Sequence, residues 1–131
     1  MVDIETRQLL LNSYQGVIST HSQYMAGYPF GSVVPFCLDG DGHAIILISD
    51  LAQHTKNLKA DAHCSLLVLG EGDDVQTAAR LTILADAQPV SCDDLDAVAQ
   101  RYYSYFPQSR DFHQVHDFSF WRLTAVKYRY I

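Results

Sequence analysis

The stretch "GYPFGSVVPF", residues 27–36, decides how this chain folds. It predicts a strand that starts at Ser32, yet Pro35 lies inside that strand. Proline has no backbone N–H to give to a neighbouring strand, so central strands normally exclude it. A glycine such as Gly31 lets the backbone approach a ligand closely. The stretch therefore predicts either an edge strand with a bulge or a strand that faces a ligand, and the residues alone leave both open.

On both sides of this stretch, turn residues and alternating apolar residues predict further strands. "DGDG", residues 39–42, is a strong hairpin signal between two of them. "HCSLLVLG", residues 63–70, has the apolar run of a buried strand, and residues 77–90 alternate between two faces. The expected strands cover residues 21–26, 32–38, 43–49, 63–70, 77–90 and 118–131.

Other segments favour helices. Leu10, Tyr14 and Ile18 recur at three- or four-residue spacing behind Asp3, a good N-cap. The expected helices cover residues 3–20, residues 51–60 and the segment from Ser91 to Pro107, and residues 110–117 are expected to be a loop. No regular strand–helix–strand alternation runs through the chain. The fold class is therefore mainly β (α+β): a six-stranded antiparallel sheet closed into a small barrel, with helices at its ends.

Length and composition fit one domain over residues 1–131 with a substantial core, because 48% of the residues are hydrophobic and 18% are charged. The formal net charge of −6 argues against a nucleic-acid partner. Three cysteines, Cys37, Cys64 and Cys92, are too widely spaced for a zinc site or a disulfide framework. A reducing, cytoplasmic location is the simplest expectation, and the first residues resemble neither a signal peptide nor a membrane span.

A candidate anion site lies in "SDLAQHTKNLK", residues 49–59. A helix N-terminus presents unpaired N–H groups and a partial positive charge, and a phosphate group suits such a place. His54, Thr55, Lys56 and Asn57 add donors close by, and Arg80 can bring a second positive group. The alternative is an ordinary solvated first turn together with a surface arginine.

The histidines allow a metal interpretation, which the sequence does not favour. His113 and His116 are three residues apart, beside Asp111 and Asp117. The segment is expected to be a loop and no third ligand is evident, so no metal site is predicted. Motifs of serine hydrolases, of P-loop nucleotidases and of dinucleotide-binding folds are also missing from the sequence.

Several stretches together resemble the pyridoxamine 5′-phosphate oxidase-like FMN-binding split barrels, near their heme-utilisation branch. They are "GYPFGSVVPF", "ILISDLAQHTKNLKAD", "CSLLVL", "ARLTILADAQPV" and "DFSFWRL", in the family's order and at about its spacing. The resemblance covers roughly residues 5–130. It implies a six-stranded Greek-key split barrel and a homodimer that holds FMN in two clefts between its subunits.

The resemblance also implies a set of cofactor-binding residues. Gly31, Ser32, Val33 and Val34 would lie along the flavin, with Ser49 and Asp50 beside it, His54, Thr55, Lys56 and Asn57 near its phosphate, and Arg80 approaching from the side. Oxidases of pyridoxamine phosphate carry an arginine at the start of the "GSVV" strand and a Ser-Arg-Lys run near residues 52–54. This chain has Gly31 and Ser32 at the first place and Ala52-Gln53-His54 at the second, so another substrate is expected.

Three functions remain open at this point. The leading hypothesis is an FMN-dependent oxidoreductase, in which the protein positions the flavin and a small-molecule substrate reacts with it. A heme-binding protein that uses the same cleft is the second, with His21, His113 or His116 as candidate axial ligands. The third is a flavin-binding protein without catalytic activity. One fold hosts many activities, so the fold alone does not separate these hypotheses.

Overall fold

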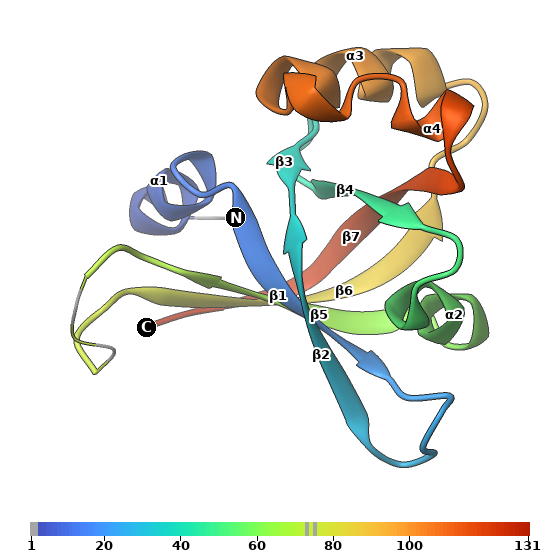
Figure 1. Cartoon of the computed structure of the whole chain (residues 1–131). Helices are drawn as coiled ribbons and strands as arrows, with labels where there is room; N and C mark the ends of the chain where they lie inside the picture. Colours follow the sequence, from blue (N-terminus) through green and yellow to red (C-terminus); the bar gives the residue numbers. More distant parts are fainter. Residues whose placement is uncertain (1–2, 73, 75) are drawn as a thin grey trace.

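In the computed structural model, which describes residues 3–72, 74 and 76–131, the stretch quoted above and the two residues after it form two strands at opposite edges of one sheet. These are β2 (Pro29–Pro35) and β3 (Cys37–Leu38), and the strand order is β2-β1-β5-β6-β7-β4-β3. A single residue, Phe36, separates them in the chain. The sheet therefore has to curl until its first and last strands meet at Phe36, which makes it a split barrel (Figure 1).

The remaining elements complete this barrel and cover it. The strands are β1 (Gln15–His21), β4 (Ala44–Ser49), β5 (His63–Leu69), β6 (Arg80–Pro89) and β7 (Phe118–Tyr130), and all pairings are antiparallel. The helices are α1 (Ile4–Leu11), α2 (Gln53–Ala60), α3 (Leu95–Tyr105), a 3₁₀ turn η1 (Pro107–Ser109) and α4 (Phe112–Val115). The predicted antiparallel split barrel is confirmed, with β2 and β3 in place of one expected strand over residues 32–38.

The position of Pro35 is explained by the edge of the sheet. Within the described sheet, β2 pairs only with β1, in an unbroken register from Gln15 opposite Pro35 to His21 opposite Pro29. Of the two alternatives left open, the edge strand is thus present, but its pairing with β1 has no bulge. At the next residue, the Phe36 N–H donates to the Tyr14 carbonyl oxygen at 3.0 Å, and the chain crosses to the other edge. The barrel is consequently split between β2 and β3, as expected of a split barrel.

The N-terminal helix is much shorter than predicted. The Asp3 carboxylate accepts the Thr6 N–H at 2.8 Å, as expected of an N-cap, but α1 ends at Leu11. Residues 15–21 form β1 instead, and the segment expected as a strand over residues 21–26 is the loop after it. β-Branched residues favour strands, and alternate residues of β1 are buried, so its period is two and not 3.6.

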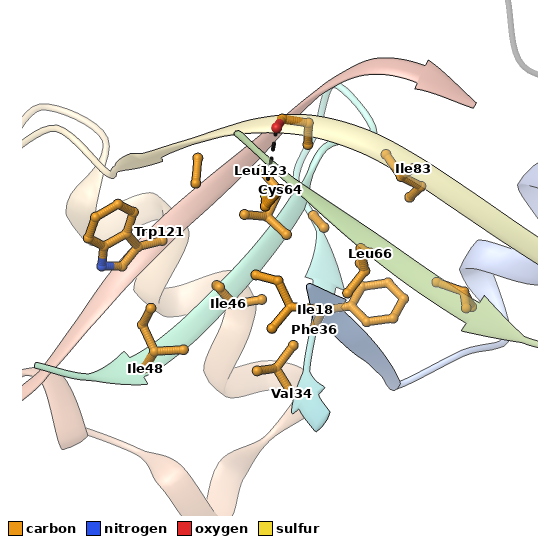
Figure 2. Close-up of a cluster of buried hydrophobic side chains, with 14 of the residues drawn as sticks. Ile18, Val34, Phe36, Ile46, Ile48, Cys64, Leu66, Ile83, Trp121 and Leu123 are labelled. Atoms are coloured by element: carbon orange, nitrogen blue, oxygen red, sulfur yellow. Dashed lines mark hydrogen bonds between the residues drawn. The ribbon is translucent and has the colours of Figure 1, made fainter. Parts of the chain in front are cut away.

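Two apolar clusters hold the fold together. The larger fills the barrel, with Ile18, Phe36 and Leu66 among its fully buried side chains (Figure 2). The second lies on the other face of β4, beneath α3 and α4, which stand together above the sheet in Figure 1. β4 is buried on both faces, which explains its continuous apolar run "AIILI". Residues 110–117, expected to be a loop, contain the short helix α4, and Phe112 packs against this second cluster.

Candidate functional site

Helix α2, whose N-terminus is the predicted anion site, begins at Gln53, two residues later than expected. Ala52 is the N-cap of α2 and makes no side-chain capping hydrogen bond. Ser49 is the last residue of β4, and Asp50 follows it in the turn before α2. The Ser49 hydroxyl accepts the Leu51 N–H at 3.2 Å, and the Asp50 carboxylate accepts the Ser119 hydroxyl at 2.9 Å. Both residues thus shape the turn that leads into α2.

The predicted strand and the predicted helix do meet. The Ser32 hydroxyl lies 3.1 Å from Nδ1 of His54, which joins β2 to α2. Nε2 of His54 is buried and has no hydrogen-bond partner within the described part of the chain. Burial lowers the pKa of His54 below its usual value, because the charged imidazolium loses hydration there. Burial therefore favours the neutral form of His54, and its Nε2 is enclosed without a hydrogen-bond partner among the described residues.

Two of the four predicted phosphate-binding side chains are used inside the protein. Thr55 is fully buried and donates its hydroxyl to the Ser49 carbonyl oxygen at 2.5 Å. Asn57 is also fully buried, and its amide nitrogen donates to the Thr20 hydroxyl at 3.0 Å. Lys56 is exposed. Of the four predicted side chains, Lys56 is thus the exposed one, and Nε2 of His54 is unpaired within the described chain but buried.

The other predicted cofactor-binding residues are distributed over different surfaces. Along β2, Gly31 and Val33 face outward, whereas Ser32 and Val34 face the barrel interior. Arg80 begins β6 opposite Leu69, at the far end of the strand pair from His63 and Asp86. At about 3.3 Å per residue, this is roughly 20 Å along the strand from the end that carries α2. Within one chain, Arg80 is therefore separate from the α2 cluster.

A groove crosses the outward face of the sheet. It has a volume of about 490 Å³ and runs over the strands from Pro29 on β2 to Val126 on β7. The register of the strands places Gly31, Ser19, Ser65 and Leu84 in one row across β2, β1, β5 and β6. Small side chains in this row leave a flat floor, and Leu84 and Val126 form apolar walls.

A polar row borders this groove on the side of α2. His21 faces outward at the end of β1, and His63 stands at the start of β5 with Asp86 opposite it. Nε2 of His63 lies 3.4 Å from the Asp86 carboxylate, and Asp61 lies 3.9 Å from ring nitrogens of both histidines. The His21, His63 and Asp86 side chains are more than half exposed to solvent, and Asp61 is half-buried. Of this row, only His21 is a candidate from the sequence.

Among the described residues, no group of three or more histidine, cysteine, aspartate or glutamate side chains could hold a metal ion. The two other candidate heme ligands lie in the region of α3 and α4. Nδ1 of His113 is 2.8 Å from the Tyr103 hydroxyl, and the His116 ring packs against Phe112. His113 and His116 are therefore separate from the groove, which His21 lines.

The comparisons with known proteins agree with this fold. Residues 2–131 match the family described as pyridoxamine 5′-phosphate oxidase, and the chain belongs to this family. It is 42% identical over 129 residues to the chloroplastic heme oxygenase HOZ of Arabidopsis thaliana, covering 97% of this chain and 39% of that protein. The chain thus spans well under half the length of this curated relative.

Solved structures show the same fold at lower identity. A heme binding protein from Mycobacterium smegmatis superimposes with a TM-score of 0.84 at 22% identity, over 100% of this chain and 55% of that one. The heme storage protein HutZ from Vibrio cholerae gives a TM-score of 0.82 at 24% identity, over 95% of this chain and 91% of that one. In addition, none of the helices that the structure describes is long and apolar enough to cross a membrane.

Proposed function

We propose that this chain is a heme-binding domain of a heme-degrading protein, and that heme binds as substrate on the outward face of the sheet. The observation that carries the proposal is the groove of about 490 Å³ with its flat floor and apolar walls. Ser19 and Ser65 form the floor, so a planar ring can lie against the strands. The 42% identity to a heme oxygenase supports the same substrate class.

The border of the groove carries histidines that could reach the metal of such a ring. Heme iron takes an axial ligand from the protein, most often a histidine nitrogen. His21 and His63 both line the groove, and carboxylates lie within 4 Å of their ring nitrogens. Carboxylates beside ligating histidines fix the ring orientation and raise its basicity. His21, expected from the sequence as a candidate ligand, thus keeps this role in the proposal.

A second copy of the chain would cover this face. Val33, Leu84 and Val126 point outward with 63%, 48% and 67% of their surface exposed. Exposed apolar patches of this kind mark binding surfaces, and twofold dimers are the commonest oligomers. In the proposed homodimer, the groove becomes a cleft between two subunits.

FMN is the second candidate ligand, favoured by one observation on α2. Lys56 is exposed on α2, and His54, two residues before it, contacts Ser32 of β2 and has a buried Nε2 without a partner in the described chain. These groups would bind a phosphate. Thr55 and Asn57 do not add to them, because their side chains are used internally. The flavin hypothesis, including an FMN-dependent oxidoreductase, therefore rests on fewer groups than the sequence predicted.

One titration separates the two candidates. Hemin is expected to give a saturable Soret band, and Ser65→Phe, which fills the floor of the groove, should weaken its binding at least about tenfold. Ser91→Phe, a substitution of the same size at an exposed position before α3, should leave hemin binding unchanged. If the wild-type protein shows no saturable Soret band but binds FMN with an affinity that Lys56→Ala reduces, heme binding is refuted in favour of the flavin.

A further inference from the structure

We infer that Lys127 and Arg129 form the carboxylate-binding end of the groove and select a ring that carries acidic side chains. The inference rests on the proposed function, because it names the part of the heme molecule that this end of the groove would recognise. It concerns the two propionate groups, which give heme its negative charge at neutral pH.

The strand register places these two cations on the correct face. Tyr128 and Tyr130 pack against the core inside the barrel, so the alternate residues Lys127 and Arg129 project outward. Lys127 stands opposite Leu84, a wall of the groove, and Arg129 stands opposite Thr82. The irregularity in this ladder, between Leu84 and Ala85, leaves Val126 in the groove and Lys127 directly after it.

The charges of Lys127 and Arg129 are not neutralised within the described chain. Neither forms an ion pair with any residue that the structure describes, although the protein carries a formal net charge of −6. By contrast, Arg122, which lies earlier on the same strand β7, forms a salt bridge with Asp39 at 2.8 Å. Two cations without ion-pair partners in the described chain, beside an apolar groove, suit a ring that carries carboxylates.

The opposite charge on the neighbouring border gives the ring an orientation. Asp61 and Asp86 lie with His21 and His63 along the side of the groove that faces α2. Carboxylates there repel propionates, whereas Lys127 and Arg129 at the β7 end attract them. One border therefore offers histidine nitrogens and the other offers cations, and a ring with acidic groups at one edge would bind in one direction.

The test compares hemin with hemin dimethyl ester, whose propionates are uncharged, both added from dimethyl sulfoxide and followed by the Soret band. Wild-type protein should bind hemin at least about tenfold more tightly than the ester. Lys127→Ala together with Arg129→Ala should remove that preference by weakening hemin binding and leaving ester binding unchanged. The matched control is Arg7→Ala with Lys59→Ala, which removes two exposed cations from α1 and α2.

The outcomes are distinct. Equal wild-type affinity for the two rings, or equal loss of both in the Lys127 and Arg129 variant, would overturn the inference and leave heme binding in the groove intact. An equal loss of hemin affinity in the Arg7 and Lys59 control would also overturn it, because net charge alone would then explain the effect. A wild-type protein that binds neither ring overturns the proposed function and the inference together. Circular dichroism of each variant checks that the fold is retained.

Discussion

Asn57 connects three segments of the chain through one buried amide. Its oxygen accepts the Gln23 N–H at 3.0 Å and the Gln53 side-chain amide at 2.9 Å, and its nitrogen donates to the Thr20 hydroxyl. Asn57→Ala leaves the buried Thr20 hydroxyl without this donor and removes the acceptor of the Gln23 N–H. We expect the free energy of unfolding to fall by about 2–4 kcal/mol, measured by urea denaturation.

The matched variant for this experiment is Gln53→Ala. It removes one hydrogen bond to the same oxygen, but Gln53 is only half-buried and water can replace it. A loss below about 1 kcal/mol is expected. If Asn57→Ala lowered the free energy of unfolding no more than Gln53→Ala, Asn57 would not be a structural residue. The phosphate-binding role predicted from the sequence would then be supported again.

His54 gives the stability of the protein a dependence on pH. Burial lowers its pKa in the folded state, so between the folded and unfolded values the unfolded chain binds more protons. The stability from the neutral ring is therefore fully present above about pH 6.5 and is lost as pH falls below it. Wild-type protein should lose more unfolding free energy between about pH 7.5 and about pH 5.5 than His54→Gln does. Equal losses in urea denaturation at the two pH values would exclude this role.

At the scale of elements, β1 depends on a close approach to β5 at Gly16. A Cβ atom at this position would lie 2.9 Å from the Leu67 carbonyl oxygen, a backbone atom that cannot move aside easily. Gly16→Ala should therefore destabilise the protein by roughly 2 kcal/mol. Gly31→Ala on the adjacent strand is the control, since its Cβ would meet only Val17 at 3.7 Å, and its effect should stay within about 0.5 kcal/mol. A thermal melt in which both variants lose the same stability would contradict this account.

The same elements show what the sequence can and cannot predict. β5 and β6 are predictable within a few residues, because β5 is a continuous apolar run and β6 alternates between two faces. The interpretation of residues 15–20 as helix is wrong, because Val17 and Ile18 happen to fall at helical distances from Leu10 and Tyr14. This segment becomes a strand because it pairs with β2 and β5. The spacing of apolar residues within one segment does not reveal pairing with strands that are distant in the sequence.

The candidate site was likewise predictable from the sequence only in part. The contact between Ser32 and His54 agrees with the sequence-based expectation that strand and helix meet there. The polar row of His63, Asp61 and Asp86 was not predicted, although alternation in "HCSLLVLG" already places His63 and Ser65 on one face. Because β1 was misassigned, nothing indicated that His21 lies beside His63. The missing information was the identity of the neighbouring strands.

For the whole molecule, the decisive prediction concerns a second copy of the chain. Val33 on β2 and Val126 on β7 lie near opposite edges of the outward face and are both more than 60% exposed. We expect the wild-type protein to have twice the chain mass in light scattering at micromolar concentration. Val33→Lys together with Val126→Lys should give monomers, because burying two ammonium groups in an apolar interface is unfavourable.

The control for this experiment is Leu11→Lys, which places a lysine on an exposed apolar position at the end of α1, away from the sheet face. A helix C-terminus tolerates a positive charge, so this variant should remain dimeric. If the cleft between subunits is the heme site, the monomeric variant should also lose hemin affinity, whereas Leu11→Lys should keep it. A monomeric variant with wild-type hemin binding would show that one groove suffices, and a monomeric wild type would refute the dimer itself.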